Sequence, residues 1–263
     1  MTLVTHEQLE QFERDGFVKF PAFLSATAVA KVNEEVDAFV RTIEPGVTPD
    51  VFFDGECSIE RLLQIRKLET RSPYFQSMYD KDPFRTVAEQ LIGRTVLPFN
   101  MHFFTKPPAS SSGTPPHQDG YYFMLAEPMD TVTMWVALEA VDDENGCLHY
   151  IPGSHRGPLR GHGTTGVVGF SQGLSEPVTE AQLSLGISMP AQPGDMLVHK
   201  AKTIHWTPAN RSAGRTRRAF GAVFYAADSI RDEPARQAYF ARMEAERMAK
   251  DGSSPSHSGF RKY

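Results

Sequence analysis

Two side chains able to bind a metal flank a single glutamine in the triplet His117-Gln118-Asp119. Side chains at positions i and i+2 of an extended strand point to the same face, so this imidazole and this carboxylate could hold one divalent cation. A surface histidine beside a turn aspartate is the alternative for the triplet alone. The context favours metal binding, because the triplet follows a Pro-rich loop and precedes an aromatic segment, residues 121–125, which we expect to be a strand.

A third ligand is expected after the turn at residues 193–195, where a strand leads to His199 and His205. Two histidines and one carboxylate that leave coordination positions open are typical of non-haem Fe(II) oxygenases. His199 competes with His205 for this role, because an unbroken strand would place both on one face. The histidine that is not a ligand is expected to be a core residue bonded to a backbone carbonyl.

A basic cluster, Arg215-Thr216-Arg217-Arg218, opens a strand expected at residues 219–225. A guanidinium inside a barrel is unfavourable unless it meets an anion, and arginine binds carboxylates through paired hydrogen bonds. A dicarboxylate cosubstrate would use one of these arginines, while the others are expected at the surface. Period-two alternation allows only one of Arg217 and Arg218 to point inward.

The elements that position these residues change in character near residue 95. Before it, helices dominate: a capping box from Thr5 to Gln8 begins the first, and residues 25–40 and 82–93 have apolar side chains at helical spacing, with a strand at 17–20. After it, Gly, Pro, Asn and Ser turns separate short strands, expected at residues 96–104, 121–125, 131–138, 146–151, 186–189, 195–199 and 219–225. This pattern predicts a mainly β fold, closed or double-sheeted, with flanking helices.

We expect a single domain over residues 1–263, since β-barrels of about 200–250 residues commonly fold as one. Its parts are a helix-rich N-terminal part packed on the barrel (1–94), the β core (95–228), a polar C-terminal helix (229–251) and a tail (252–263). Residues 157–182 are expected to be a long loop between strands, of a length that is usually functional or mobile.

Composition excludes several classes of protein. The chain has 27 Lys and Arg against 32 Asp and Glu, a net charge of −5, which argues against nucleic acid as the main partner. Apolar stretches fall short of the roughly 20 residues of a membrane span. Two cysteines, Cys57 and Cys147, exclude a disulfide framework and Cys-based zinc sites. The N-terminus shows no secretory signal, so a cytoplasmic location is expected.

Taken together and in order, these motifs resemble the phytanoyl-CoA dioxygenase family of Fe(II)/2-oxoglutarate-dependent oxygenases. The resemblance runs from Gln8 to about Asp228. Beside the His-x-Asp triplet it rests on Gln11-Phe12, Asp15-Gly16-Phe17, Trp135, Asn145-Gly146-Cys147-Leu148, Ile151-Pro152-Gly153-Ser154-His155, Pro193-Gly194-Asp195, and His205 followed by Asn210, Ser212 and arginine. It implies a double-stranded β-helix, a jelly-roll barrel of the cupin type.

The resemblance also implies roles for individual residues. His117, Asp119 and His205 match the iron ligands, and Arg217 matches the arginine that holds the distal carboxylate of 2-oxoglutarate. The remaining matches concern the cosubstrate pocket: Thr207 as the hydroxyl partner of that arginine, Trp135 as a lining aromatic, and Lys67 and His102 as upstream polar contacts. The segment between Ser212 and Arg217 is one residue longer than usual in the family, so Arg218 stays an alternative to Arg217.

An enzyme of this kind binds Fe(II), 2-oxoglutarate and O₂, hydroxylates or otherwise oxidises its substrate, and releases succinate and CO₂. Related halogenases have a small residue where this chain has Asp119, so oxidation without halide is expected. The aromatic residues 121–124 and the segment 157–182 are expected to border the entrance for a small-molecule metabolite. Two alternatives remain: a non-catalytic cupin-like binding protein, and a barrel metalloenzyme independent of 2-oxoglutarate. The sequence leaves the substrate and the oligomeric state open.

Overall fold

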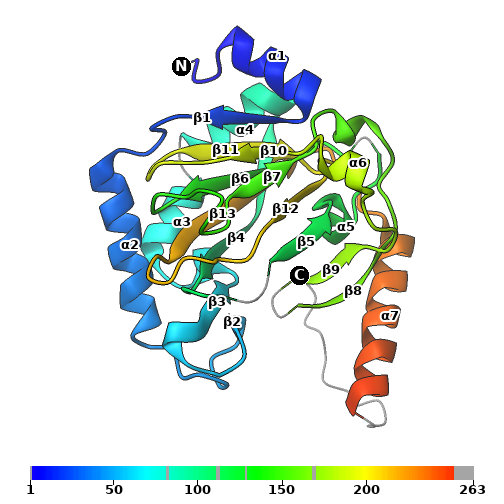
Figure 1. The fold of residues 1–263 in the computed structure, drawn as a ribbon. Coiled ribbons are helices and arrows are strands. Elements are labelled where there is room, and N and C mark those ends of the chain that lie inside the picture. Colours follow the sequence, from blue (N-terminus) through cyan, green and yellow to red (C-terminus); the bar gives the residue numbers. More distant parts are fainter. Residues whose placement is uncertain (1, 81–82, 111–112, 128, 168–169, 252–263) are drawn as a thin grey trace.

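The computed structural model describes residues 2–80, 83–110, 113–127, 129–167 and 170–251, and two antiparallel sheets form its centre (Figure 1). Within these residues the larger sheet has seven strands. In spatial order they are β1 (Phe17–Phe20), β11 (Met196–Lys200), β6 (Thr131–Ala137), β13 (Arg217–Ala226), β4 (Val96–Lys106), β3 (Leu62–Ile65) and β2 (Val51–Phe53). The N-terminal part therefore supplies three strands of this sheet, in addition to the helices expected there.

The smaller sheet has four strands in the described part of the chain, β10 (Ile187–Met189), β7 (Leu148–Tyr150), β12 (His205–Thr207) and β5 (Thr114–His117), in that spatial order. A separate hairpin, β8 (His162–Val167) and β9 (Phe170–Leu174), contacts β5. The predicted mainly β, double-sheet architecture is confirmed.

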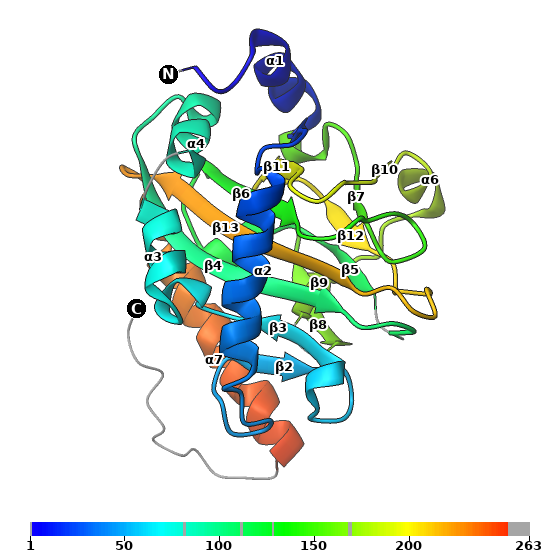
Figure 2. The same cartoon turned by 90° about the vertical axis from the view of Figure 1, so that its left-hand side faces the viewer.

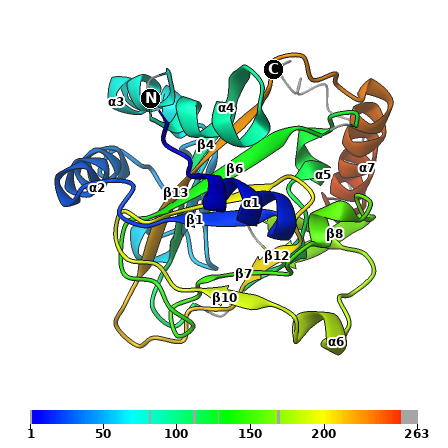
Figure 3. The same cartoon turned by 90° about the horizontal axis from the view of Figure 1, so that it is seen from above.

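Helices cover the outer face of the larger sheet, and Figure 2 shows α2 lying across it. Seen from above, α2, α3 and α4 lie on one side of the barrel, and α7 lies on the other beside the hairpin β8–β9 (Figure 3). The α-helices are α1 (His6–Asp15), α2 (Ala26–Val40), α3 (Pro73–Asp80), α4 (Phe84–Ile92), α5 (Gly120–Phe123), α6 (Glu180–Leu183) and α7 (Glu233–Asp251), and the 3₁₀ turns are η1 (Ile59–Arg61), η2 (Leu68–Thr70) and η3 (Ser154–Arg156).

The ends of the first helix form as its sequence predicts. Thr5 accepts a hydrogen bond from the Gln8 amide while the Gln8 side chain accepts one from the Thr5 amide, so the capping box is complete. Gly16 ends the helix at φ +85°, and a Cβ there would lie 2.3 Å from the His155 ring. Only glycine fits this left-handed, crowded position.

Alternation along each strand of the larger sheet separates a core from a cavity. On β13, Phe220, Ala222 and Phe224 are fully buried in the apolar core that the helices cover. The intervening Gly221 and Val223 line an internal cavity between the sheets. The larger apolar core thus lies under the helices, while the space between the sheets holds a smaller apolar cluster, which includes Trp135, Leu148 and Tyr150, beside the cavity.

Two sequence predictions for this region are wrong. Residues 121–125, expected as a strand, form the short helix α5 instead, because the chain turns at Asp119 (φ −59°, ψ −30°) and ends the helix at Met124 (φ +51°). Residues 157–182, expected as a long loop, contain the hairpin β8–β9 and the start of α6. The polar C-terminal helix is confirmed as α7, and the predicted tail 252–263 lies outside the described residues.

No helix in the described part of the chain is long and apolar enough to span a bilayer.

Candidate active site

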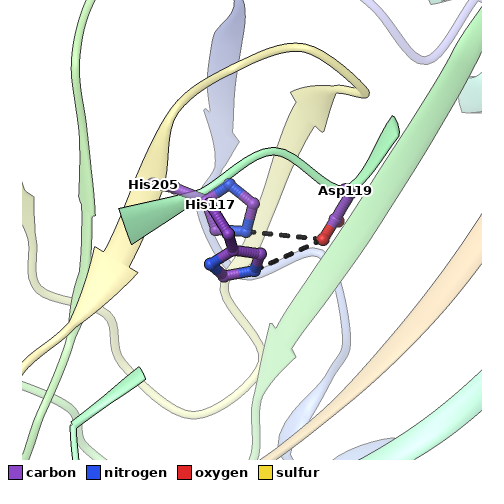
Figure 4. Close-up of side chains that lie close together, drawn as sticks. All are labelled: His117, Asp119 and His205. Atoms are coloured by element: carbon purple, nitrogen blue, oxygen red, sulfur yellow. Dashed lines mark ion pairs between the residues drawn. The ribbon is translucent and has the colours of Figure 1, made fainter. Parts of the chain in front are cut away.

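The side chains of His117, Asp119 and His205 converge (Figure 4), and all three line the cavity. Asp119 Oδ1 lies 3.5 Å from His117 Nε2 and 3.7 Å from His205 Nε2. All three potential ligand atoms lie within 4.8 Å of one another, and both histidines are buried. Two imidazoles and one carboxylate at one side of a cavity form a facial donor set that suits Fe(II) and leaves positions open.

Strand pairing brings the two histidines together. β12 runs antiparallel to β5, with His205 directly opposite His117. The His117 Nδ1–H donates to the Pro115 carbonyl at 2.8 Å, and the His205 Nδ1–H donates to the Thr203 carbonyl at 2.9 Å. Each bond fixes the tautomer, because it places the proton on Nδ1 and leaves the Nε2 lone pair for a metal.

Asp119 lies in a turn, and not on the strand face that its spacing from His117 suggests. β5 ends at His117, and Asp119 adopts a helical conformation at the start of α5 rather than a position on the same strand face. Its Oδ2 accepts hydrogen bonds from Thr133 Oγ1 at 2.6 Å and from His199 Nε2 at 3.0 Å. These two donors orient the carboxylate so that Oδ1 faces the histidines.

Gln118, the middle residue of the triplet, is fully buried and holds this turn in place. Its side-chain amide donates to the carbonyls of Pro158 and Lys202, and its oxygen accepts from the Arg160 amide. Its own backbone amide donates to His162 Nε2 at 3.0 Å. The segment around residues 158–162 therefore supports the ligand turn, a role that the sequence does not signal.

His199 is a supporting residue and lies outside the converging ligand group. Its Nε2–H donates to Asp119, and its Nδ1 accepts from the Tyr150 hydroxyl at 2.9 Å. The expectation of a backbone carbonyl partner for the second histidine is wrong, because a carboxylate and a phenol occupy both ring nitrogens. Tyr150 stacks on Phe17 with ring centroids 4.5 Å apart, which fixes the far end of this chain of hydrogen bonds.

The ionisation states suit metal binding at neutral pH. Burial opposes the charge on Asp119, but the hydrogen bonds that its carboxylate accepts hold the pKa of this carboxyl well below its usual range. Burial, together with the adjacent histidines, holds the pKa of His205 well below its usual value. The carboxylate is therefore ionised and the imidazole neutral, as metal ligands must be.

The cavity has a volume of about 340 Å³ and extends from the triad to Arg217. Arg217 is 3% exposed, and its Nε and Nη1 have no hydrogen-bond partner among the described residues. Its guanidinium lies 5.6 Å from the centre of the Trp135 ring, and burial lowers its pKa to about 10, so it stays charged at neutral pH. A buried cation with unsatisfied donors in a cavity fits an anionic ligand.

Alternation on β13 sends Arg218 to the other face of the sheet. Its Nη2 lies 2.6 Å from Asp37 Oδ1 on α2, and its guanidinium lies over Phe103. Of the two alternatives, only Arg217 faces the cavity. Thr207 and Trp135 also line it, as their predicted roles require, and Thr207 Oγ1 accepts a 3.4 Å hydrogen bond from the Thr114 amide.

The two upstream predictions have different outcomes. His102 lines the cavity, is bonded to Gln64, and has its pKa lowered to about 3, chiefly by burial. Lys67 lies outside the cavity lining and pairs with Asp50 at 3.2 Å. The adjacent Arg66 lines the cavity instead, so the expected cation is present one position earlier in the sequence. The sequence of this segment does not indicate which of Lys67 and Arg66 faces the cavity.

Comparisons with known proteins agree with this geometry. A family model described as phytanoyl-CoA dioxygenase matches residues 12–219. The chain is 28% identical over 167 residues to the peroxisomal phytanoyl-CoA dioxygenase of Bos taurus, covering 59% of this chain and 49% of that one, about half its length. It is 26% identical over 234 residues to a probable alpha-ketoglutarate-dependent hypophosphite dioxygenase of Stutzerimonas stutzeri, covering 84% and 78% of the two chains.

Among solved structures, EvdO2 from Micromonospora carbonacea var. aurantiaca, complexed with 2-oxoglutarate, superposes with a TM-score of 0.68 at 26% identity, covering 88% of this chain and 94% of that one. The predicted double-stranded β-helix is confirmed by this likeness. With a family match over most of its length, the chain belongs to the phytanoyl-CoA dioxygenase family of Fe(II)/2-oxoglutarate-dependent oxygenases.

Proposed function

We propose that the protein oxidises a small-molecule metabolite in a reaction that depends on Fe(II) and 2-oxoglutarate, with hydroxylation as the expected outcome. The observation that carries this proposal is the pairing, in one cavity, of a facial donor set with the buried guanidinium of Arg217, whose Nε and Nη1 lack protein partners. A metal alone would not need the cation, and an anion alone would not need the three converging ligands.

The residues of this chain have distinct tasks in that reaction. His117, Asp119 and His205 would hold the iron, while Thr133 and His199 keep the Asp119 carboxylate in orientation. When bound, iron, 2-oxoglutarate and O₂ together supply the oxidising chemistry, with succinate and CO₂ as the other products.

Arg217 would bind the distal carboxylate of 2-oxoglutarate, with Trp135 against its guanidinium and Thr207 on the cavity wall nearby. Because Asp119 keeps a carboxylate at the metal, the site favours oxidation without halide. His102 and Arg66 place further polar groups along the same cavity.

The remaining cavity wall supports a substrate with an apolar or ring-containing part. Phe99, Tyr122, Phe123 and Tyr239 line it, and Tyr239 comes from α7. The Tyr122 hydroxyl donates to the Gln172 carbonyl on β9, so the hairpin within residues 157–182 borders this region. The relatives' names give different substrates, phytanoyl-CoA and hypophosphite, so similarity at this level does not identify the substrate of this chain.

The test is a screen of metabolites in which O₂ consumption and succinate release are measured together. The proposal predicts succinate release that requires Fe(II), increases with a true substrate and is lost in His205→Ala. O₂ consumption without succinate would instead support a metalloenzyme independent of 2-oxoglutarate. Ligand binding without either signal would support a non-catalytic binding protein.

A further inference from the structure

A second group of side chains able to bind a metal lies at strand β7. Asp143 Oδ1 lies 3.2 Å from His149 Nε2 and 3.3 Å from Cys147 Sγ, and Cys147 Sγ lies 3.8 Å from His149 Nε2. None of the three lines the cavity described above. Since Leu148 lines that cavity and Tyr150 contacts His199, alternation directs His149 to the opposite side of the strand. Cys147 directly precedes the strand and is fully buried, with its Sγ toward His149 and Asp143.

The three distances match the edges of a tetrahedron around one zinc ion. Zinc binds thiolate at about 2.3 Å, imidazole at about 2.0–2.1 Å and carboxylate at about 2.0–2.2 Å. Tetrahedral angles then separate sulfur from oxygen by about 3.5 Å, sulfur from nitrogen by about 3.6 Å and nitrogen from oxygen by about 3.3 Å. The observed separations of 3.3, 3.8 and 3.2 Å agree with these values to within about 0.2 Å.

Neighbouring residues hold the three ligands in place. The His149 ring stacks on Trp206 with centroids 5.2 Å apart and an interplanar angle of 24°. Ser188, directly opposite His149 on β10, donates a hydrogen bond of 2.7 Å to Asp143 Oδ1 (β7 and β10 lie side by side in Figure 1). The Asp143 side chain is 60% exposed, His149 is partly exposed and Cys147 is buried, so an ion would enter from the Asp143 side, where water can complete its coordination.

We propose that Asp143, Cys147 and His149 form a second metal site that binds Zn²⁺, with water as the fourth ligand. One thiolate and one imidazole favour zinc over the oxygen-seeking cations Mg²⁺ and Ca²⁺. On binding, the Cys147 thiol releases its proton to solvent and sulfur takes the metal in its place. The cysteine count excludes sites built from several cysteines, but not a mixed site with a single one.

Strand β7 connects this site with the iron ligands. His149 lies on the outer side, and the next residue, Tyr150, bonds to His199, which in turn bonds to Asp119. An ion at the outer site would therefore hold the strand that carries Tyr150. This makes the site structural, and its occupancy is expected to raise the melting temperature of the protein.

Cobalt is the probe, because Co²⁺ bound to a thiolate gives an intense near-ultraviolet charge-transfer band. The iron site contains no sulfur, so this band reports the outer site alone. We expect the band in the wild-type protein, in His117→Ala and in Cys57→Ser, which removes the exposed cysteine. It should be absent from Cys147→Ser, and His149→Gln should weaken cobalt binding at least 10-fold. Zn²⁺ should displace the cobalt from each protein that shows the band. In the His117→Ala background, where the iron triad is incomplete, Zn²⁺ should also raise the melting temperature, and adding Cys147→Ser should abolish this rise.

The proposal is overturned if wild type shows no thiolate band at millimolar Co²⁺, if Cys147→Ser keeps the band, or if Cys57→Ser loses it. Circular dichroism of each metal-free variant checks its folding. If Cys147→Ser fails to fold, the variants His149→Gln and Asp143→Asn, at a partly exposed and an exposed position, test the proposal instead. Unchanged cobalt affinity in both would show that the cluster is a hydrogen-bonded network and not a metal site.

Discussion

Replacing Arg217 by methionine should change cosubstrate affinity and protein stability in opposite directions. The guanidinium is 3% exposed, and two of its nitrogens have no partner within the described residues. Each buried donor left unsatisfied destabilises the fold by about 1–3 kcal/mol, while the contact between the guanidinium and the Trp135 ring stabilises it by about 0.5–2 kcal/mol. The two donors together cost about 2–6 kcal/mol, so the free energy of unfolding of the metal-free variant is expected to stay unchanged or to rise, by at most about 5 kcal/mol.

The affinity for 2-oxoglutarate should fall steeply in the same variant. Removing one partner of a buried, hydrogen-bonded charge pair costs about 2–5 kcal/mol, which corresponds to a dissociation constant roughly 30- to 4,000-fold higher. Calorimetric titration of the Mn²⁺-loaded protein with 2-oxoglutarate measures this directly, since manganese supports no turnover. Urea denaturation of the metal-free protein gives the stability.

Arg218→Met is the matched control. Its ion pair with Asp37 is partly exposed, so the loss should cost about 1 kcal/mol of stability or less, and the affinity for 2-oxoglutarate should stay within about threefold of wild type. The reasoning would be refuted by an Arg217→Met affinity within threefold of wild type. A loss of more than 2 kcal/mol in its metal-free stability would likewise show that Arg217 serves the fold rather than a ligand.

Three further predictions concern the residues that support the triad. Thr133→Val removes a 2.6 Å hydrogen bond to Asp119 at nearly constant volume, and should weaken metal binding about 10- to 100-fold in a chelator competition assay, with an unchanged affinity counting against the orienting role. Gln118→Ala leaves three backbone groups without partners and should lower the free energy of unfolding by about 2–4 kcal/mol in urea; a loss below 1 kcal/mol would contradict this. Burial lowers the pKa of His162 to about 4, so the unfolded chain takes up a proton below pH 6.5 that the folded chain does not. Between pH 6.5 and 4 the free energy of unfolding of the metal-free wild-type protein should therefore fall by about 1 kcal/mol per pH unit more than that of His162→Gln. Equal slopes for the two proteins would show that His162 does not cause this pH dependence.

The sequence predicted the parts of the site that depend on local pattern. Period-two alternation correctly required that only one of Arg217 and Arg218 faces inward, and helix capping placed the first helix at its observed start. The converging group His117, Asp119 and His205 follows from residue type, order and family resemblance.

Other features depend on contacts between distant segments, which a single sequence does not show. The aromatic residues after Asp119 have strand propensity, but the turn that brings the carboxylate to the histidines makes them helical. Gln118 and His162 support that turn through partners about 40 residues apart or more in the chain. Lys67 and Arg66 differ by one position: Arg66 lines the cavity just after β3, while Lys67 adopts a left-handed conformation (φ +56°) before η2 and pairs with Asp50.

The central claim is that one cavity binds Fe(II) through His117, Asp119 and His205 and binds 2-oxoglutarate beside it. An anaerobic titration of the Fe(II)-loaded protein with 2-oxoglutarate, followed by visible absorption, tests this most directly. The account predicts a weak charge-transfer band that saturates at one equivalent and is absent from His117→Ala. Saturated Fe(II) binding without this band in the wild-type protein would contradict it.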